Sequence, residues 1–116
     1  KNAGYVKNTF PYIAQAKAAI IHGGLSTLHE AIYLGKPVLL IIDPYHPEEG
    51  NNGRKVEELG CGMMIRKDLV TKESLREAIL SCMKMEVCDM RGLYDKERGA
   101  ENFCRVLDEI VPEWKK

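Results

Sequence analysis

Residues 18–42 read Ala-Ala-Ile-Ile-His-Gly-Gly-Leu-Ser-Thr-Leu-His-Glu-Ala-Ile-Tyr-Leu-Gly-Lys-Pro-Val-Leu-Leu-Ile-Ile, and this stretch decides the fold. It begins and ends with short apolar runs, residues 18–21 and 38–42, that no polar residue interrupts. Uninterrupted runs, unlike alternating ones, are typical of strands covered on both faces, as in a parallel sheet. We therefore expect two buried parallel strands.

The residues between the two runs predict a helix over residues 26–34. Leu28, Ala31 and Ile32 would share its buried side, and Gly35 is the expected C-terminal cap before Lys36-Pro37 stops the helix. A strand, a helix and a second parallel strand form a βαβ unit, whose crossover is right-handed.

The rest of the chain predicts further elements of the same α/β kind. We expect a short helix over residues 9–15, a polar loop over 43–51, a helix over 52–59 and a third strand over 63–65. Two amphipathic helices would close the chain, with apolar stripes at Leu75, Ala78, Ile79, Cys82 and Met83 and at Ala100, Phe103, Cys104, Leu107, Ile110 and Val111. With no internal repeat or flexible linker, the pattern predicts one Rossmann-like domain, a parallel sheet flanked by helices.

Length and charge limit the classes of function. The 116 residues, 45% of them apolar, suit one domain. Seventeen basic residues balance 17 acidic ones, so no overall field would attract nucleic acid or an anionic membrane. The longest apolar run is too short to be a transmembrane segment, and no signal-peptide pattern opens the chain, which favours a cytoplasmic protein.

The four cysteines, at 61, 82, 88 and 104, contain no Cys-x-x-Cys pair. They indicate small buried hydrophobic residues in a reducing compartment, not a disulfide or zinc framework.

The turn after the first strand carries the candidate chemistry. Gly23 and Gly24 lack a Cβ, so the backbone can turn sharply and approach a ligand closely. Ser26 and Thr27 lie at the predicted helix start, where the first N–H groups have no intrahelical partner and the helix dipole is positive. These features together form an anion site that needs no lysine.

Two charged or titratable side chains extend this site. His22, at the tip of the strand, can donate from its ring to a phosphate oxygen. Glu30, about one turn inside the helix, can accept two hydroxyl hydrogens, and a ribose diol is the natural candidate. Taken singly, each feature has a structural explanation: a common Gly-Gly turn, a packing histidine, ordinary N-caps at Ser26 and Thr27, and a solvated Glu30.

The pattern resembles the donor-site signature of GT-B glycosyltransferases that use UDP-sugars, such as the plant-type enzymes and the lipid-intermediate GlcNAc transferase of peptidoglycan synthesis. The residues concerned are His-Gly-Gly-x-Ser-Thr-x-x-Glu-Ala at 22–31 and Leu-Gly-Lys-Pro-Val at 34–38. The likeness continues through residues 52–60, which are similar to the family's Asn-Ala-x-x-Leu-x-x-x-Gly stretch, and is weak over the last two helices.

The resemblance implies roles for individual residues. The turn from His22 to Thr27 would contact the donor diphosphate, and Glu30 would hold the ribose hydroxyls. Where the family has an acidic residue followed by Gln, both contacting the sugar, this chain has Glu48 and Glu49. A carboxylate only accepts hydrogen bonds where an amide also donates, so the identity of the sugar stays open. The candidate substrate-binding residues are His22, Gly23, Gly24, Leu25, Ser26, Thr27, Glu30, Glu48, Glu49 and Asn52.

His46, in the same expected loop, could reach the sugar or be a solvated loop residue. The three histidines form no metal-ligand pattern with acidic pairs, so we expect a metal-independent site without a cofactor, with the UDP-sugar as substrate. Oriented N–H groups and a helix dipole would stabilise the charge on the departing nucleoside diphosphate.

The resemblance places the catalytic base in another, N-terminal domain. Residues 1–116 would then be part of a single nucleotide-sugar-binding domain, without the acceptor domain and the first strands of the donor domain. Such a chain, either a fragment or a subunit that needs a partner, would by itself transfer no sugar. Two other functions stay open: a nucleotide-sugar hydrolase or epimerase on this scaffold, or a non-catalytic partner-binding subunit that uses its C-terminal helices. Trp114, in the tail, would otherwise pack on its own domain.

Overall fold

The computed structural model is built on a sheet of three parallel strands, and it describes residues 2–87, 89, 91–93 and 99–115. The strands lie in the order β1-β2-β3, with β1 at Ala19–Ile21, β2 at Val38–Ile42 and β3 at Gly62–Arg66. Leu39 of β2 is in register with Ile20 of β1 and Met63 of β3. The parallel α/β fold predicted from the sequence is confirmed.

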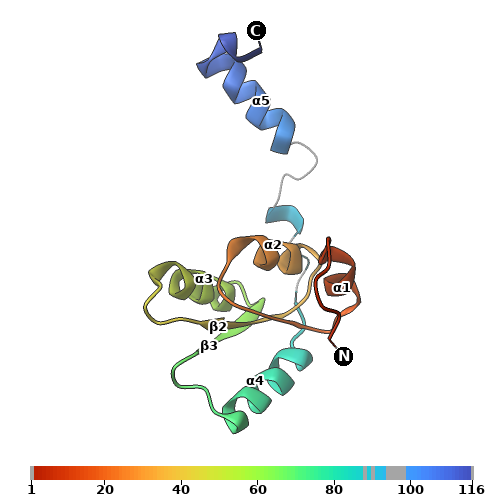
Figure 1. Ribbon diagram of the computed structural model, residues 1–116, viewed down its shortest axis with the longest axis vertical. Coiled ribbons are helices and arrows are strands. Elements are labelled where there is room, and N and C mark those ends of the chain that lie inside the picture. The colour runs from red at the N-terminus through yellow and green to blue at the C-terminus, as the bar shows by residue number, and fades with distance from the viewer. Residues whose placement is uncertain (1, 88, 90, 94–98, 116) are drawn as a thin grey trace.

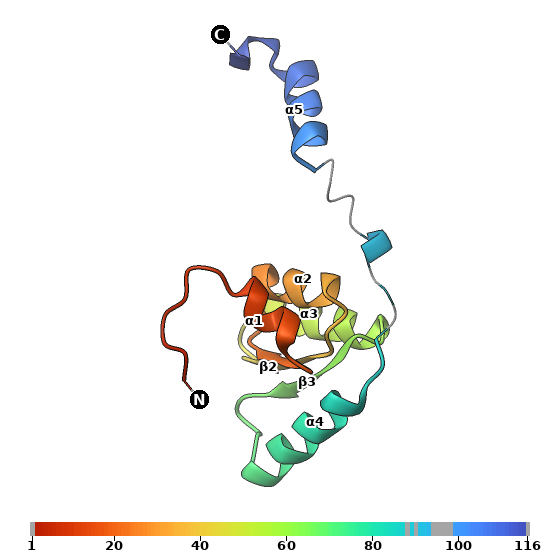
Figure 2. The same ribbon diagram turned by 90° about the vertical axis from the view of Figure 1, so that its right-hand side faces the viewer.

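Helices cover both faces of this sheet (Figure 1). The helices are α1 (Phe10–Gln15), α2 (Leu25–Tyr33), α3 (Pro47–Glu58), α4 (Lys72–Lys84) and α5 (Gly99–Ile110), with 3-10 turns at Arg91–Leu93 and Pro112–Lys115. Helices α1, α2 and α3 lie on one face and α4 lies on the other, as the turned view in Figure 2 also shows.

The central strand β2 holds the core. Val38 and Leu40 pack toward α2 and α3, while Leu39 packs against Ala78 and Cys82 of α4. All three β2 side chains are fully buried, so the expectation of a strand covered on both faces is confirmed for β2. It is wrong for the edge strand β1, where Ile20 is 50% exposed although α4 lies on the same face of the sheet.

The helix boundaries near the turn differ slightly from expectation. Helix α2 begins at Leu25 and not at Ser26, with Gly24 as an extended N-cap residue (φ −72°, ψ 150°). Gly35 follows the helix with φ +68°, a left-handed conformation that favours glycine, so the predicted C-terminal cap is confirmed.

The expected polar loop over residues 43–51 is wrong, because α3 already begins at Pro47. Proline suits the first position of a helix, where its missing N–H costs nothing. Glu48 and Glu49 then lie in the first turn, where carboxylates complement the positive end of the helix dipole. The helix also contains Gly50, a residue of low helix propensity that is more typical of loops.

Helix α5 forms as its apolar stripe predicts, but it stands away from the sheet (Figure 1). It contains no buried residue, and Phe103 and Ile110 are 64% and 71% exposed. Trp114, in the 3-10 turn that follows α5, is exposed, and its Nε1–H donates to Asp108 Oδ1 of α5 at 2.9 Å. Beyond this contact with α5, the packing of Trp114 on its own domain stays a prediction.

The described cysteines differ in burial. Cys61 and Cys82 are buried and free, and burial raises the pKa of both thiols, as expected for small core residues. Cys104 is exposed on α5, so the expectation is wrong there. Cys88 lies outside the described residues. Within the described part of the chain, no helix is long and apolar enough to cross a membrane.

Candidate donor-binding site

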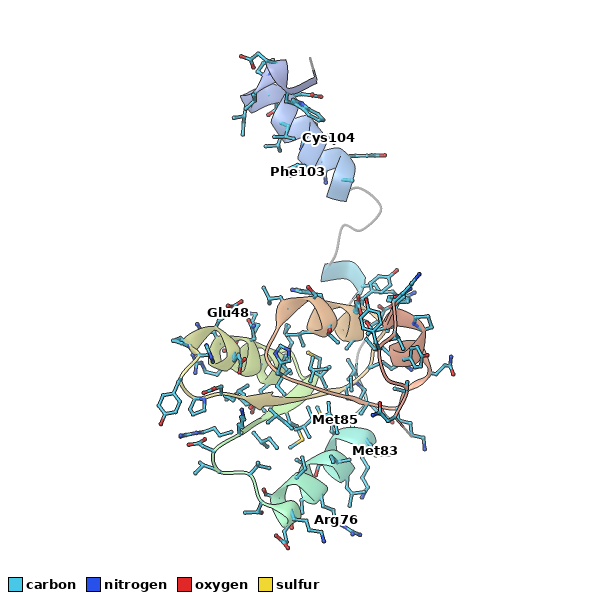
Figure 3. The ribbon with its side chains drawn as sticks, in the orientation of Figure 1. Glu48, Arg76, Met83, Met85, Phe103 and Cys104 are labelled. Carbon is cyan, nitrogen blue, oxygen red and sulfur yellow. The ribbon has the colours of Figure 1, made fainter. Side chains whose placement is uncertain are left out.

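The candidate site lies where two strands end and two helices begin. Helix α2 follows β1, and α3 follows β2, so both helices start at the carboxyl edge of the sheet. Open α/β sheets bind their ligands at this edge. Glu48 projects from the start of α3 there (Figure 3).

The start of α2 is open. No side chain caps the helix, and its first turn contains no acidic residue. The alternative that Ser26 or Thr27 is an ordinary N-cap is therefore wrong. A hollow of about 290 Å³ borders this turn, lined by Ile21, His22, Gly24, Leu25, Ser26 and Thr27. Unpaired N–H groups, two hydroxyls and a positive helix end beside a hollow can hold an anion.

A second hollow of about 300 Å³ shares His22 with the first. It is lined by His22, Gly23, Gly24, His46, Pro47, Glu48 and Glu49. The structure thus brings the residues expected at the diphosphate next to those expected at the sugar. His46 belongs to this group, with Nε2 lying 3.9 Å from Asp43 Oδ2.

Helix α3 holds the glycine turn by direct contacts. The Asn52 Nδ2 amide donates to the Gly23 carbonyl at 2.7 Å. Glu49 Oε2 accepts from the Asp43 backbone N–H at 2.6 Å, while Glu49 Oε1 lies 3.9 Å from His22 Nδ1. Sequence reasoning missed Asp43, whose only signal was its position directly after β2.

Glu30 lies apart from both hollows. It is half-buried on α2, and its Oε2 accepts from the Thr9 hydroxyl at 3.0 Å. It lines neither hollow. Thr9 is 21 residues away in the chain, and no sequence pattern pointed to this contact.

The described residues contain no group of three or more histidine, cysteine, aspartate or glutamate side chains that could hold a metal ion. Metal independence stays a prediction.

Comparison with known families decides the affiliation of this domain. The sequence model of the family described as "Glycosyltransferase family 28 C-terminal domain" matches residues 1–104. The chain belongs to this family. The fold is accordingly that of a GT-B C-terminal domain, as the resemblance implied.

Relatives of this family 28 domain include an uncharacterized glycosyltransferase of Methanosarcina mazei, 36% identical over 104 residues, or 90% of this chain and 26% of the relative. An uncharacterized glycosyltransferase of Methanopyrus kandleri is 31% identical over 89% of the chain and 29% of its own length. An NDP-glycosyltransferase of Bacillus licheniformis is 36% identical over 84% of this chain and 25% of its own length. The domain thus spans about a quarter of the length of these relatives.

A solved structure supports the same conclusion. The calicheamicin glycosyltransferase CalG4 superposes with a TM-score of 0.69 at 26% identity, covering 89% of this domain and 29% of that chain. The glycosyltransferase of kitacinnamycin shares the fold. It superposes with a TM-score of 0.62 at 24% identity, covering 69% of this domain and 20% of that chain. These comparisons support neither a hydrolase or epimerase nor a non-catalytic subunit.

Proposed function

We propose that this family 28 domain binds the donor of a glycosyltransferase that moves a sugar from a nucleoside-diphosphate sugar to an acceptor. The observation that carries the proposal is the uncapped start of α2, which opens on a hollow beside His22. The name of the Bacillus relative supports a nucleoside-diphosphate sugar, and the resemblance of residues 22–31 favours UDP.

In this proposal, the first N–H groups of α2 and the His22 ring bind the diphosphate. Negative charge grows on the diphosphate as the sugar departs, and fixed dipoles stabilise that charge without reorganising at the moment of reaction. A Cβ on Gly24 would come within 2.8 Å of His22 Cε1, so glycine at this position lets the His22 ring lie directly against the turn. Leu25, Ser26 and Thr27 form the first turn of α2, whose N–H groups have no intrahelical acceptor.

Glu30 is proposed to accept from the ribose hydroxyls and Glu48 from the sugar. A carboxylate offers about four acceptor positions, so Glu30 can bind ribose while it accepts from Thr9. Glu48 is exposed and lines the same hollow as His22, the ring proposed to bind the diphosphate. Asn52 contributes by holding the Gly23 carbonyl.

The acceptor and the catalytic base are assigned to the rest of the protein, since the domain spans about 26% of the Methanosarcina relative. We extend the proposal to a cytoplasmic enzyme whose acceptor domain and remaining donor-domain strands come from outside residues 1–116. The neutral net charge is in keeping with a small-molecule donor and not with nucleic acid.

Isothermal titration of the full-length protein with UDP, UDP-glucose and UDP-N-acetylglucosamine tests the proposal. We expect UDP to bind, and the sugar nucleotides to release UDP only when an acceptor is present. Failure of every nucleoside diphosphate to bind would overturn the assignment, and rapid hydrolysis without acceptor would indicate a hydrolase.

A further inference from the structure

We propose that Glu49 is a positioning residue, whose carboxylate fixes the two loops of the diphosphate site and is not a ligand of the donor sugar. The inference rests on the function proposed above and assigns a different role from the one that the family resemblance implied.

The first contact joins α3 to the end of β2. Glu49 Oε2 accepts from the Asp43 backbone N–H at 2.6 Å. Asp43 is the first residue after β2, and the Glu49 side chain is 21% exposed. A charged acceptor that is mostly shielded from water makes a stronger hydrogen bond than an exposed one. The carboxylate therefore fixes the start of α3 relative to the sheet.

The second contact reaches the ligand-binding histidine. Glu49 Oε1 lies 3.9 Å from His22 Nδ1, an ion-pair distance when the ring is protonated. The His22 side chain is 81% exposed, so little packing holds the ring in place. At this distance the contact is electrostatic, and a carboxylate, which only accepts, complements a ring that carries a hydrogen on Nδ1. Nε2 of the protonated ring is then left to donate to a phosphate.

The third contact concerns the backbone of the turn. A Cβ on Gly23 would lie 2.6 Å from Glu49 Cβ and 2.7 Å from Glu49 Cα, so α3 sits directly against the turn. Asn52, three residues further along the same helix face, donates to the Gly23 carbonyl. Two consecutive residues of the turn, 22 and 23, are thus held by positions 49 and 52 of α3.

These contacts leave Glu49 poorly suited to a sugar. One of its oxygens accepts from the Asp43 N–H, the other faces the His22 ring, and the side chain is only 21% exposed. The neighbouring Glu48 lines the same hollow and is exposed, which makes it the better sugar ligand of the two.

The test compares UDP with UDP-glucose, because a positioning residue affects both and a sugar ligand affects only the second. The variants are Glu49→Ala and Glu49→Gln in the full-length protein, with Glu57→Ala as a control that removes an exposed carboxylate from the same helix. We expect Glu49→Ala to weaken both ligands by one common factor on the order of tenfold, since misplacing a reacting or binding group by about 1 Å costs up to about a hundredfold.

Glu49→Gln is expected to bind both ligands nearly as well as the native protein. Its amide oxygen can accept from the Asp43 N–H while its NH₂ group donates to a neutral imidazole. Glu57→Ala should leave both affinities unchanged. If Glu49→Ala does not fold, Glu49→Asp replaces it in the test. The aspartate side chain keeps the charge but is too short to make the same contacts. The Asp variant should therefore lower the affinity for both ligands by the same factor.

Normal UDP binding by the Ala or Asp variant, with loss confined to UDP-glucose, would overturn the inference and restore the sugar role. Loss of UDP binding in Glu49→Gln as large as in Glu49→Ala would also overturn it, because hydrogen bonding would then not be what the side chain supplies. If the native protein binds neither ligand, the proposed function itself fails, before any variant is compared.

Discussion

Gly23 has no room for a side chain, and the obstruction is the backbone and Cβ of Glu49. For Gly23→Ala, we expect the free energy of unfolding to fall by about 1–3 kcal/mol, the usual cost of forcing an extra methyl group into a packed site. Urea unfolding of the variant measures this change. Gly92→Ala is the control, because nothing lies within 4 Å of the added Cβ. Equal stability of the two variants would contradict the packing of α3 against the turn.

His22 should contribute to donor binding and little to stability, because its side chain is 81% exposed. We expect His22→Ala to weaken UDP about tenfold or more, since a hydrogen bond to a charged group is worth about 1.5–3 kcal/mol. Calorimetric titration measures the affinity, and a thermal melt should show an unchanged transition. Native UDP affinity in this variant would exclude the ring from the diphosphate site.

Among the secondary-structure elements, strand β2 and helix α5 differ sharply in what they contribute to stability. Leu39 is fully buried in β2, whereas Ile110 on α5 is 71% exposed. Leu39→Ala should cost about 2–5 kcal/mol, the range for large-to-small changes in a core. Ile110→Ala should change the unfolding free energy by less than about 0.5 kcal/mol, as is usual for surface positions. Chemical denaturation measures the free energy of unfolding of both variants. A large decrease for Ile110→Ala would show that α5 packs on the sheet.

How far the sequence predicts these elements depends on the range of the interactions. The apolar run of β2 and the cap at Gly35 are local signals, and both predictions are confirmed. The start of α3 is not evident from the sequence, because Pro47 and Gly50 are as typical of a loop as of the first turns of a helix. The contacts of Glu49 with Asp43 and of Thr9 with Glu30 depend on how separate segments meet, and no local pattern contains that information.

At the scale of the whole molecule, the described residues leave β1 partly uncovered. A hollow there is lined by Lys17, Ala18, Ile20, Ile79 and Met83, next to the half-exposed Ile20. Because the domain spans about 26% of the Methanosarcina relative, we expect residues 1–116 alone to transfer no sugar and to bind UDP more weakly than the full-length protein. Parallel titrations of the two proteins measure the difference. Low-micromolar UDP affinity in the 116-residue chain would contradict this expectation.

The most direct test of the central claim is a crystal structure of the full-length protein with UDP. We predict that diphosphate oxygens lie within hydrogen-bond distance of the backbone N–H groups in the first turn of α2, residues 25–27, with the His22 ring beside them. A diphosphate bound elsewhere, with the start of α2 closed by the protein's own side chains, would contradict the account.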